Sequence, residues 1–135
     1  MPGLSDLDEL IERVRAAGLP TTLEVQGAAG PVSTGVQLAA YRLIQEALTN
    51  TLKHGGPGTH AEVRLRCEGR QLRVEIDDDG AGEFAEAPST VGGGLPGMRE
   101  RVHAYGGQVS AGAREPAGWR VIATLPLDER GAATL

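Results

Sequence analysis

The chain has 135 residues and a mass of 14.0 kDa, which gives room for one domain, 1–135. Thirteen Lys and Arg against 18 Asp and Glu leave a net charge of −5, which argues against a nucleic-acid-binding module. The single cysteine excludes an internal disulfide framework and favours a reducing cytoplasm. No apolar run approaches the ~18 residues that span a bilayer, so we expect no membrane contact by this segment.

Hydrophobic spacing predicts a helix, a strand and a long helix in the first part of the chain. The first helix covers residues 4–18 and the strand 21–25, so 1–32 forms an N-terminal helix and strand. Ser33 or Thr34 can cap the long helix, which ends near His54 at a Gly-Gly-Pro-Gly run.

The second part of the chain predicts hairpins around one further helix. Alternating segments at 61–67 and 72–76 are followed by an Asp- and Gly-rich loop over 77–94, a helix at 95–105, and strands at 108–113 and 119–125. This order predicts an α+β domain with one mixed, mostly antiparallel sheet and helices on one face.

The long helix carries a polar stripe that hydrophobic packing does not explain. Glu46, Asn50, Lys53 and His54 share one face at spacings of i, i+4, i+7 and i+8. Their side chains offer oxygen ligands for Mg²⁺ and positive charge for a phosphate. A solvated charged face is the alternative interpretation.

Two glycine-containing segments lie at the two ends of the expected loop. Asp77-Asp78-Asp79-Gly80-Ala81-Gly82 follows a strand directly, so one carboxylate can accept hydrogen bonds from a ligand amine while the glycines allow close approach. Gly92-Gly93-Gly94-Leu95 opens a helix, where backbone N–H groups form an anion site. An ordinary Asp-Gly turn and a flexible joint are the alternatives.

Three segments together resemble the N box and the two glycine boxes of the GHKL ATPases. They are QEALTNTLKHG (45–55), IDDDGAG (76–82) and GGGLPGMRERVHAYGG (92–107), and the resemblance spans residues 36–127. The superfamily includes gyrase, heat-shock-90 chaperones, sensor histidine kinases and mismatch-repair proteins. The resemblance implies a Bergerat ATP-binding fold, a two-layer α/β sandwich that binds ATP and Mg²⁺. The Gly-Met-Arg-Glu-Arg form of the last box looks like histidine kinases of the nitrate-sensor type.

The resemblance also implies roles for single residues. Asn50 would bind Mg²⁺ with Glu46 beside it, Lys53 would approach the phosphates, and His54 would line the pocket. Asp78 would accept the adenine amino group. The remaining expected nucleotide contacts are Gly80, Gly82, Gly92, Gly94, Leu95, Gly97 and Thr124, with residues 83–94 as the ATP lid.

The implied activity is that of a histidine kinase without its phosphoacceptor. His54, His60 and His103 fit that role poorly, so we expect γ-phosphoryl transfer to a histidine on a separate dimerisation domain absent from this chain, and then to a response regulator. Without that domain we expect no autophosphorylation. The alternatives are a stand-alone anti-sigma-factor serine kinase of the same superfamily and a non-catalytic nucleotide-binding interaction module.

Overall fold

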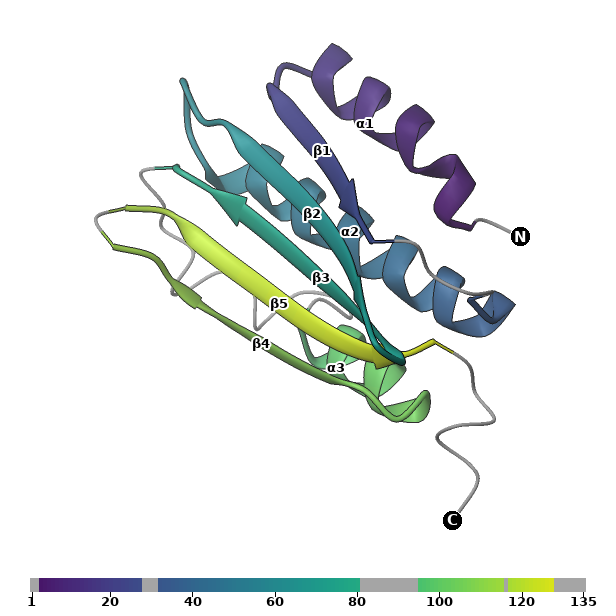
Figure 1. Cartoon of the computed structure of the whole chain (residues 1–135). Helices are drawn as coiled ribbons and strands as arrows, with labels where there is room; N and C mark the ends of the chain where they lie inside the picture. The colour runs from purple at the N-terminus through teal and green to yellow at the C-terminus, as the bar shows by residue number, and fades with distance from the viewer. Residues whose placement is uncertain (1–2, 28–31, 81–94, 116, 128–135) are drawn as a thin grey trace.

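Five strands form one sheet in the order β1-β2-β3-β5-β4 (Figure 1). The strands are β1 (Thr21–Gln26), β2 (Ala61–Glu68), β3 (Gln71–Asp78), β4 (Gln108–Ala113) and β5 (Trp119–Pro126). β1 pairs with β2 in parallel, and the other neighbouring pairs are antiparallel. The predicted mixed, mostly antiparallel sheet is therefore confirmed. This computed structural model describes residues 3–27, 32–80, 95–115 and 117–127.

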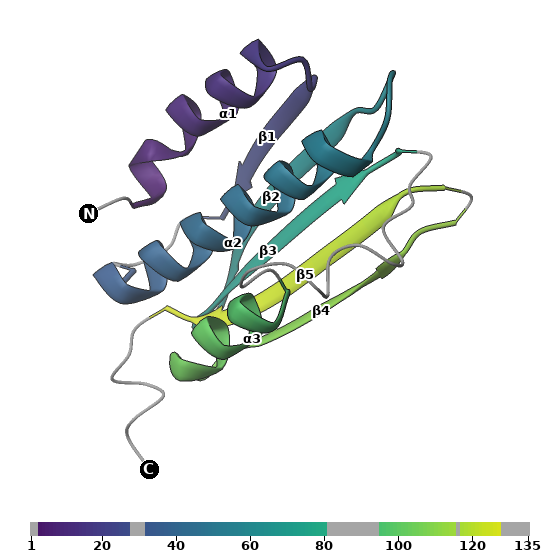
Figure 2. The same cartoon turned by 180° about the vertical axis from the view of Figure 1, so that it is seen from behind.

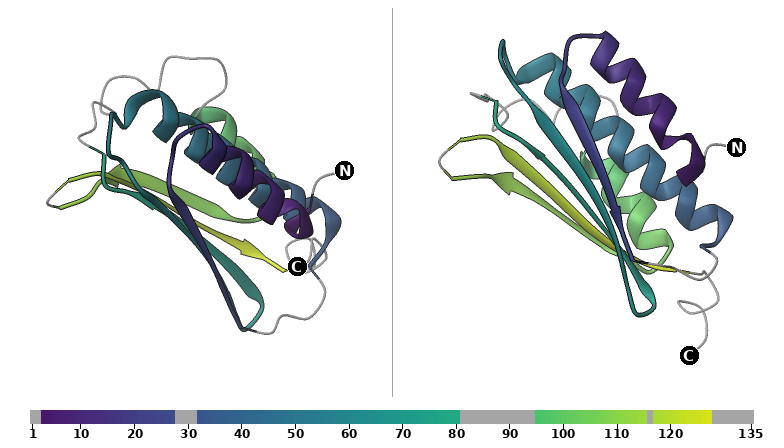
Figure 3. Two further views of the ribbon diagram at one scale, coloured as in Figure 1. Left: turned by 90° about the horizontal axis from the view of Figure 1, so that it is seen from above. Right: turned by 45° about the horizontal axis from the view of Figure 1, so that its top comes forward.

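The helices of the described residues pack on a single face of the sheet (Figures 2 and 3). They are α1 (Leu7–Ala16), which follows a 3-10 turn at Leu4–Asp6, α2 (Thr34–His54) and α3 (Leu95–Ala104). Of the two possible caps of α2, Ser33 accepts the N–H of Val36 at 3.2 Å. The two-layer α/β sandwich is thus confirmed. Within the described ranges, no helix has both the length and the apolar character needed to cross a membrane.

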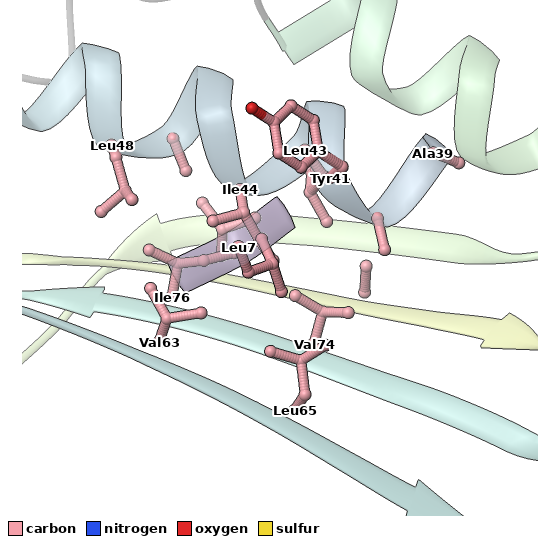
Figure 4. Close-up of a cluster of buried hydrophobic side chains, with 14 of the residues drawn as sticks. Leu7, Ala39, Tyr41, Leu43, Ile44, Leu48, Val63, Leu65, Val74 and Ile76 are labelled. Atoms are coloured by element: carbon pink, nitrogen blue, oxygen red, sulfur yellow. The ribbon is translucent and has the colours of Figure 1, made fainter. Parts of the chain in front are cut away.

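The hydrophobic core lies between α2 and the sheet (Figure 4). Aliphatic side chains of α2 meet the inward side chains of β2 and β3, and α1 covers the β1 side of the sheet. The side chains with less than 2% exposure are Ile11, Val36, Leu43, Ile44, Leu48, Val63, Leu72, Val74, Met98, Val102 and Leu125. Full burial of such a side chain contributes about 1.5–3 kcal/mol. The core therefore fixes α2 against β3, and with it the relative position of their ends.

Strand β3 is longer than the sequence predicts. The density of Asp and Gly after Ile76 predicts a loop from residue 77, but the ladder continues, with Asp78 opposite Ala61 on β2 and Trp119 on β5. The strand can extend because the carboxylates of Asp77 and Asp78 each receive hydrogen bonds from other elements. The expected lid, 83–94, lies outside the described residues.

Candidate functional site

The three consecutive aspartates at the end of β3 point in different directions. Asp78 faces the helix layer, where its carboxylate contacts Thr51 of α2. Asp77 faces the helix-free side of the sheet, as side chains alternate along a strand. Asp79 is exposed, and its Oδ1 accepts the backbone N–H of His60 at 2.6 Å. Asp78 is therefore the one of the three that is directed between the sheet and the helices.

The Asp78 carboxylate is held by two different donors. Its Oδ2 accepts a hydrogen bond from Oγ1 of Thr51 at 3.0 Å, and its Oδ1 accepts one from the backbone N–H of Gly80 at 3.0 Å. The residue is only 3% exposed. Because each carboxylate oxygen can accept more than one hydrogen bond, both oxygens retain capacity for a ligand N–H.

Burial raises the pKa of Asp78 above the ordinary aspartate value, and the neighbouring Asp79 adds to this rise. The hydrogen bonds from Gly80 and Thr51 and the charge of Arg114 act in the opposite direction without cancelling it. The charge of a buried carboxylate is costly unless hydrogen-bond donors surround it. A buried carboxylate with a perturbed pKa is therefore a candidate for binding a ligand that supplies a further donor.

Gly80 packs closely on the loop that follows α2. A Cβ at Gly80 would lie 2.7 Å from the carbonyl oxygen and 2.8 Å from the Cα of Gly55, and 3.1 Å from Oγ1 of Thr59. The close approach expected at Gly80 is therefore present, but the described neighbour is the protein's own backbone. The missing side chain allows the end of β3 to contact the end of α2.

Three residues around Asp78 were not identified from the sequence. They are Thr51, Arg114 and Gly118. Nη1 of Arg114 donates a hydrogen bond to the backbone carbonyl oxygen of Asp78 at 2.9 Å. A Cβ at Gly118 would lie 1.9 Å from the same oxygen. Gly118 also has a φ of 107°, which disfavours any side chain. The sequence signal that could have identified Thr51 is its position four residues after Ala47, which places its hydroxyl on the buried face of α2.

The polar stripe of α2 occupies the helical turns on either side of Thr51. Glu46, Asn50 and His54 are half-buried, and Lys53 is exposed. Asn50 immediately precedes Thr51, so the structure brings the proposed metal ligand to the same end of the molecule as Asp78. The motif of α2 and the aspartate motif lie close together because α2 and β3 both end on this side of the domain (Figure 2).

The oxygen donors of this region fit a magnesium ion that is shared with a nucleotide. Asn50 and Glu46 offer oxygens one helical turn apart, and no group of three or more His, Cys, Asp or Glu able to hold a metal occurs among the described residues. Mg²⁺ usually takes one or two protein oxygens and completes its shell with water and substrate phosphates. The donor set therefore suits a metal–nucleoside triphosphate.

Thr124 is not brought to this cluster. On β5, the side chains of Val121, Ala123 and Leu125 are buried under the helices, so Thr124 faces the helix-free side of the sheet. Asp78 faces the helix side, so the sheet separates the two side chains. The expected position of Thr124 beside an adenine is corrected accordingly.

The other expected glycines differ in their surroundings. Gly97 lies within α3, and a Cβ there would meet no described atom within 4 Å. Leu95 is the first residue of α3. Gly82, Gly92 and Gly94 lie outside the described residues.

A network of charges covers the helix-free side of β3. Glu75 accepts from Arg64 at 2.8 Å and from Arg73 at 3.0 Å, and Asp77 accepts from Nε of Arg120 at 2.7 Å. Burial raises the pKa of Asp77, and Glu75 adds to the rise although Arg120 opposes it. Burial also acts to raise the pKa of Glu75, but its interactions with Asp77 and the arginines hold that pKa below the ordinary value. This network pairs Glu75 and Asp77 with arginines on the face of the sheet opposite to Asp78.

The fold agrees with the sequence family that the chain matches. Residues 35–129 match the family model described as histidine kinase-, DNA gyrase B- and HSP90-like ATPase, and the chain belongs to this family. The resemblance to the GHKL ATPases is thereby confirmed.

Relatives of the chain include sensor histidine kinases. YxjM of Bacillus subtilis (strain 168) is 36% identical over 129 residues, which cover 94% of this chain and 31% of that kinase. The histidine-protein kinase/phosphatase DegS of Brevibacillus brevis is 36% identical over 93 residues, 68% of this chain and 24% of DegS. The catalytic domain of histidine kinase ThkA shares the fold, with a TM-score of 0.68 at 16% identity over 93% of this chain and 95% of that one. The chain is a histidine kinase-type ATPase domain, and it spans less than a third of either curated relative.

Proposed function

We propose that this chain is the ATP-binding catalytic domain of a two-component sensor histidine kinase of the nitrate-sensor type. It would transfer the γ-phosphoryl group of ATP to a histidine on a separate dimerisation domain, from which the group passes to a response regulator. The observation that carries the proposal is the buried Asp78 carboxylate, which is hydrogen-bonded to Thr51 of α2, the residue that follows Asn50. The similarity to sensor histidine kinases supports the reaction, and the Gly-Met-Arg-Glu-Arg run at 97–101 supports the subtype.

The proposed roles rest on the resemblance to the GHKL ATPases and are compatible with the chemistry of each side chain. Asp78 accepts the adenine amino group, Asn50 holds Mg²⁺ with Glu46 beside it, and Lys53 neutralises phosphate charge. When bound, Mg²⁺ supplies charge neutralisation at the phosphates. Phosphoryl transfer depends mainly on such positioning and neutralisation. The further proposed nucleotide contacts are His54, Gly80, Gly82, Gly92, Gly94, Leu95 and Gly97, with 83–94 as the lid.

The proposal includes the surroundings in which the domain works. ATP and Mg²⁺ are the required small molecules, and the dimerisation domain and the response regulator are the protein partners. Because the domain uses ATP, we infer that it acts in the cytoplasm. By itself it would bind ATP without phosphorylating any of its own histidines.

The test is phosphoryl transfer from labelled ATP to the dimerisation domain of the same full-length protein, supplied as a second chain. We expect transfer with the wild-type domain and its loss in Asn50→Ala, because the metal ligand is removed. Gln45→Ala changes another half-buried polar residue of α2 and should retain transfer. Undiminished transfer by Asn50→Ala would refute the metal assignment. Phosphorylation of a serine protein instead would identify an anti-sigma-factor kinase, and ATP binding without any transfer would identify an interaction module.

A further inference from the structure

The hydroxyl of Thr51 lies between two acceptors. Its Oγ1 is 3.0 Å from Oδ2 of Asp78 and 3.1 Å from the carbonyl oxygen of Ala47, one turn earlier in α2. Thr51 is 4% exposed, so water does not compete freely for this hydroxyl. A hydroxyl has a single proton, which must be given mainly to one of the two oxygens.

The carboxylate is the acceptor that needs this proton. The Ala47 carbonyl already accepts the backbone N–H of Thr51 within α2, as in any regular helix. Among the hydrogen bonds between described residues, Thr51 supplies the one donor to Oδ2 of Asp78. A hydrogen bond to an ionised acceptor is also stronger than one to a carbonyl. The hydroxyl therefore donates to Asp78 when the carboxylate is charged.

Two donors from different elements then hold the carboxylate in one orientation. Gly80 holds Oδ1 through its backbone at the end of β3, and Thr51 holds Oδ2 from α2. Rotation of the carboxylate about its Cβ–Cγ bond would break both hydrogen bonds. The free lone pairs are therefore aimed before a ligand arrives, and a preorganised acceptor binds more tightly than one that must be ordered on binding.

We propose that Thr51 is a positioning residue that orients the Asp78 carboxylate and so sets the preference for a purine that carries a 6-amino group. This inference rests on the proposed function, because it takes the ATP base to be the group that meets Asp78. Thr51 itself does not contact the base in this proposal. Its effect should therefore appear only with ligands that donate a hydrogen bond to Asp78.

The test compares two ligands and three proteins by calorimetry in the presence of Mg²⁺. The ligands are ATP and purine riboside 5′-triphosphate, which lacks the 6-amino group. Thr51→Val keeps the shape of the side chain but has no hydroxyl, and Thr51→Ser keeps the hydroxyl but lacks the methyl group. We expect Thr51→Val to bind ATP about tenfold more weakly, as for one lost charge-assisted hydrogen bond, with the analogue unchanged within about twofold. Thr51→Ser should keep the wild-type ratio of the two affinities.

The ratio of affinities separates positioning from a general structural role. An equal loss for both ligands, or an unchanged ratio in Thr51→Val, would overturn the inference, as would a Thr51→Ser variant that behaves like Thr51→Val. If Thr51→Val does not fold, as judged by urea unfolding without nucleotide, Thr51→Ala gives the same comparison. A wild-type domain that does not bind ATP would refute the proposed function, whereas ATP binding with an unaltered ratio would refute only the role of Thr51.

Discussion

Replacement of Gly80 by alanine tests the contact that joins the end of β3 to the end of α2. The added Cβ would lie 2.7 and 2.8 Å from backbone atoms of Gly55, which cannot move aside as a flexible side chain would. Overpacking of this kind costs about 1–3 kcal/mol. The φ of Gly80 is outside the left-handed region, so alanine can adopt this backbone conformation. Alanine also lowers the conformational entropy of the unfolded chain, which stabilises the folded state by roughly 0.4–1 kcal/mol. With the midpoints of these two ranges, the free energy of unfolding should fall by about 1.3 kcal/mol.

Gly97→Ala is the matched control, because the sequence assigns both glycines to the nucleotide site. In α3 a Cβ at Gly97 meets no described atom within 4 Å, so helix propensity should stabilise this variant by up to ~1 kcal/mol. Both variants are measured by urea unfolding without nucleotide, followed by the fluorescence of the single tryptophan, Trp119, which pairs with Asp78 across β3 and β5. A Gly80→Ala domain as stable as the wild type would refute the packing argument. Loss of ATP affinity at unchanged stability would show that Gly80 acts on the ligand instead.

Two further variants separate the two faces of β3. Asp78→Asn keeps groups that can bond to Gly80 and Thr51 but removes a buried charge, and should weaken ATP binding by roughly 1.5–3 kcal/mol in calorimetry. Because burial raises the pKa of Asp78 in the folded state, the wild type loses stability as pH rises from the unfolded pKa through the folded pKa. Urea titrations should therefore show the stability advantage of Asp78→Asn growing with pH across that window, and a constant difference would contradict the pKa shift. Arg120→Ala leaves Asp77 without the partner 2.7 Å away and should lower stability by about 1–2 kcal/mol, since the exposed arginine is partly screened by water. The second change Asp77→Asn should recover part of that loss, and ATP affinity should stay unchanged; a loss of affinity in Arg120→Ala would contradict the separation of the two faces.

The sequence predicted the elements well because burial in this fold follows simple periodicity. Every predicted helix and strand between residues 4 and 125 is present, with ends shifted by a few residues. The predicted end of β3 was wrong, because an Asp-Asp-Asp-Gly run has low strand propensity and therefore indicates a loop. Its strand conformation depends on donors from distant segments, such as Arg120 and Thr51, which no local pattern shows.

The prediction of the site was incomplete for a similar reason. The motifs indicated Asp78 and the polar stripe of α2, but the partner of Asp78 is Thr51, 27 positions away in the sequence. A hydroxyl at a core position of a helix is visible in the sequence, whereas the carboxylate that it contacts is known only from the fold. The error at Thr124 was avoidable, because the alternation of Val121, Ala123 and Leu125 already places Thr124 on the opposite face.

The contacts around Asp78 couple the site to three segments that lie far apart in the sequence. Thr51 comes from α2, Gly80 from the residue pair after β3, and Arg114 from the connection between β4 and β5. Burial disfavours the charge of Asp78, and these donors offset only part of that cost. A ligand amine that donates to the same carboxylate would offset more of it, so nucleotide binding should stabilise the contact between all these segments. Stability and nucleotide affinity should therefore change together for substitutions around Asp78, whereas substitutions around Asp77 should change stability alone.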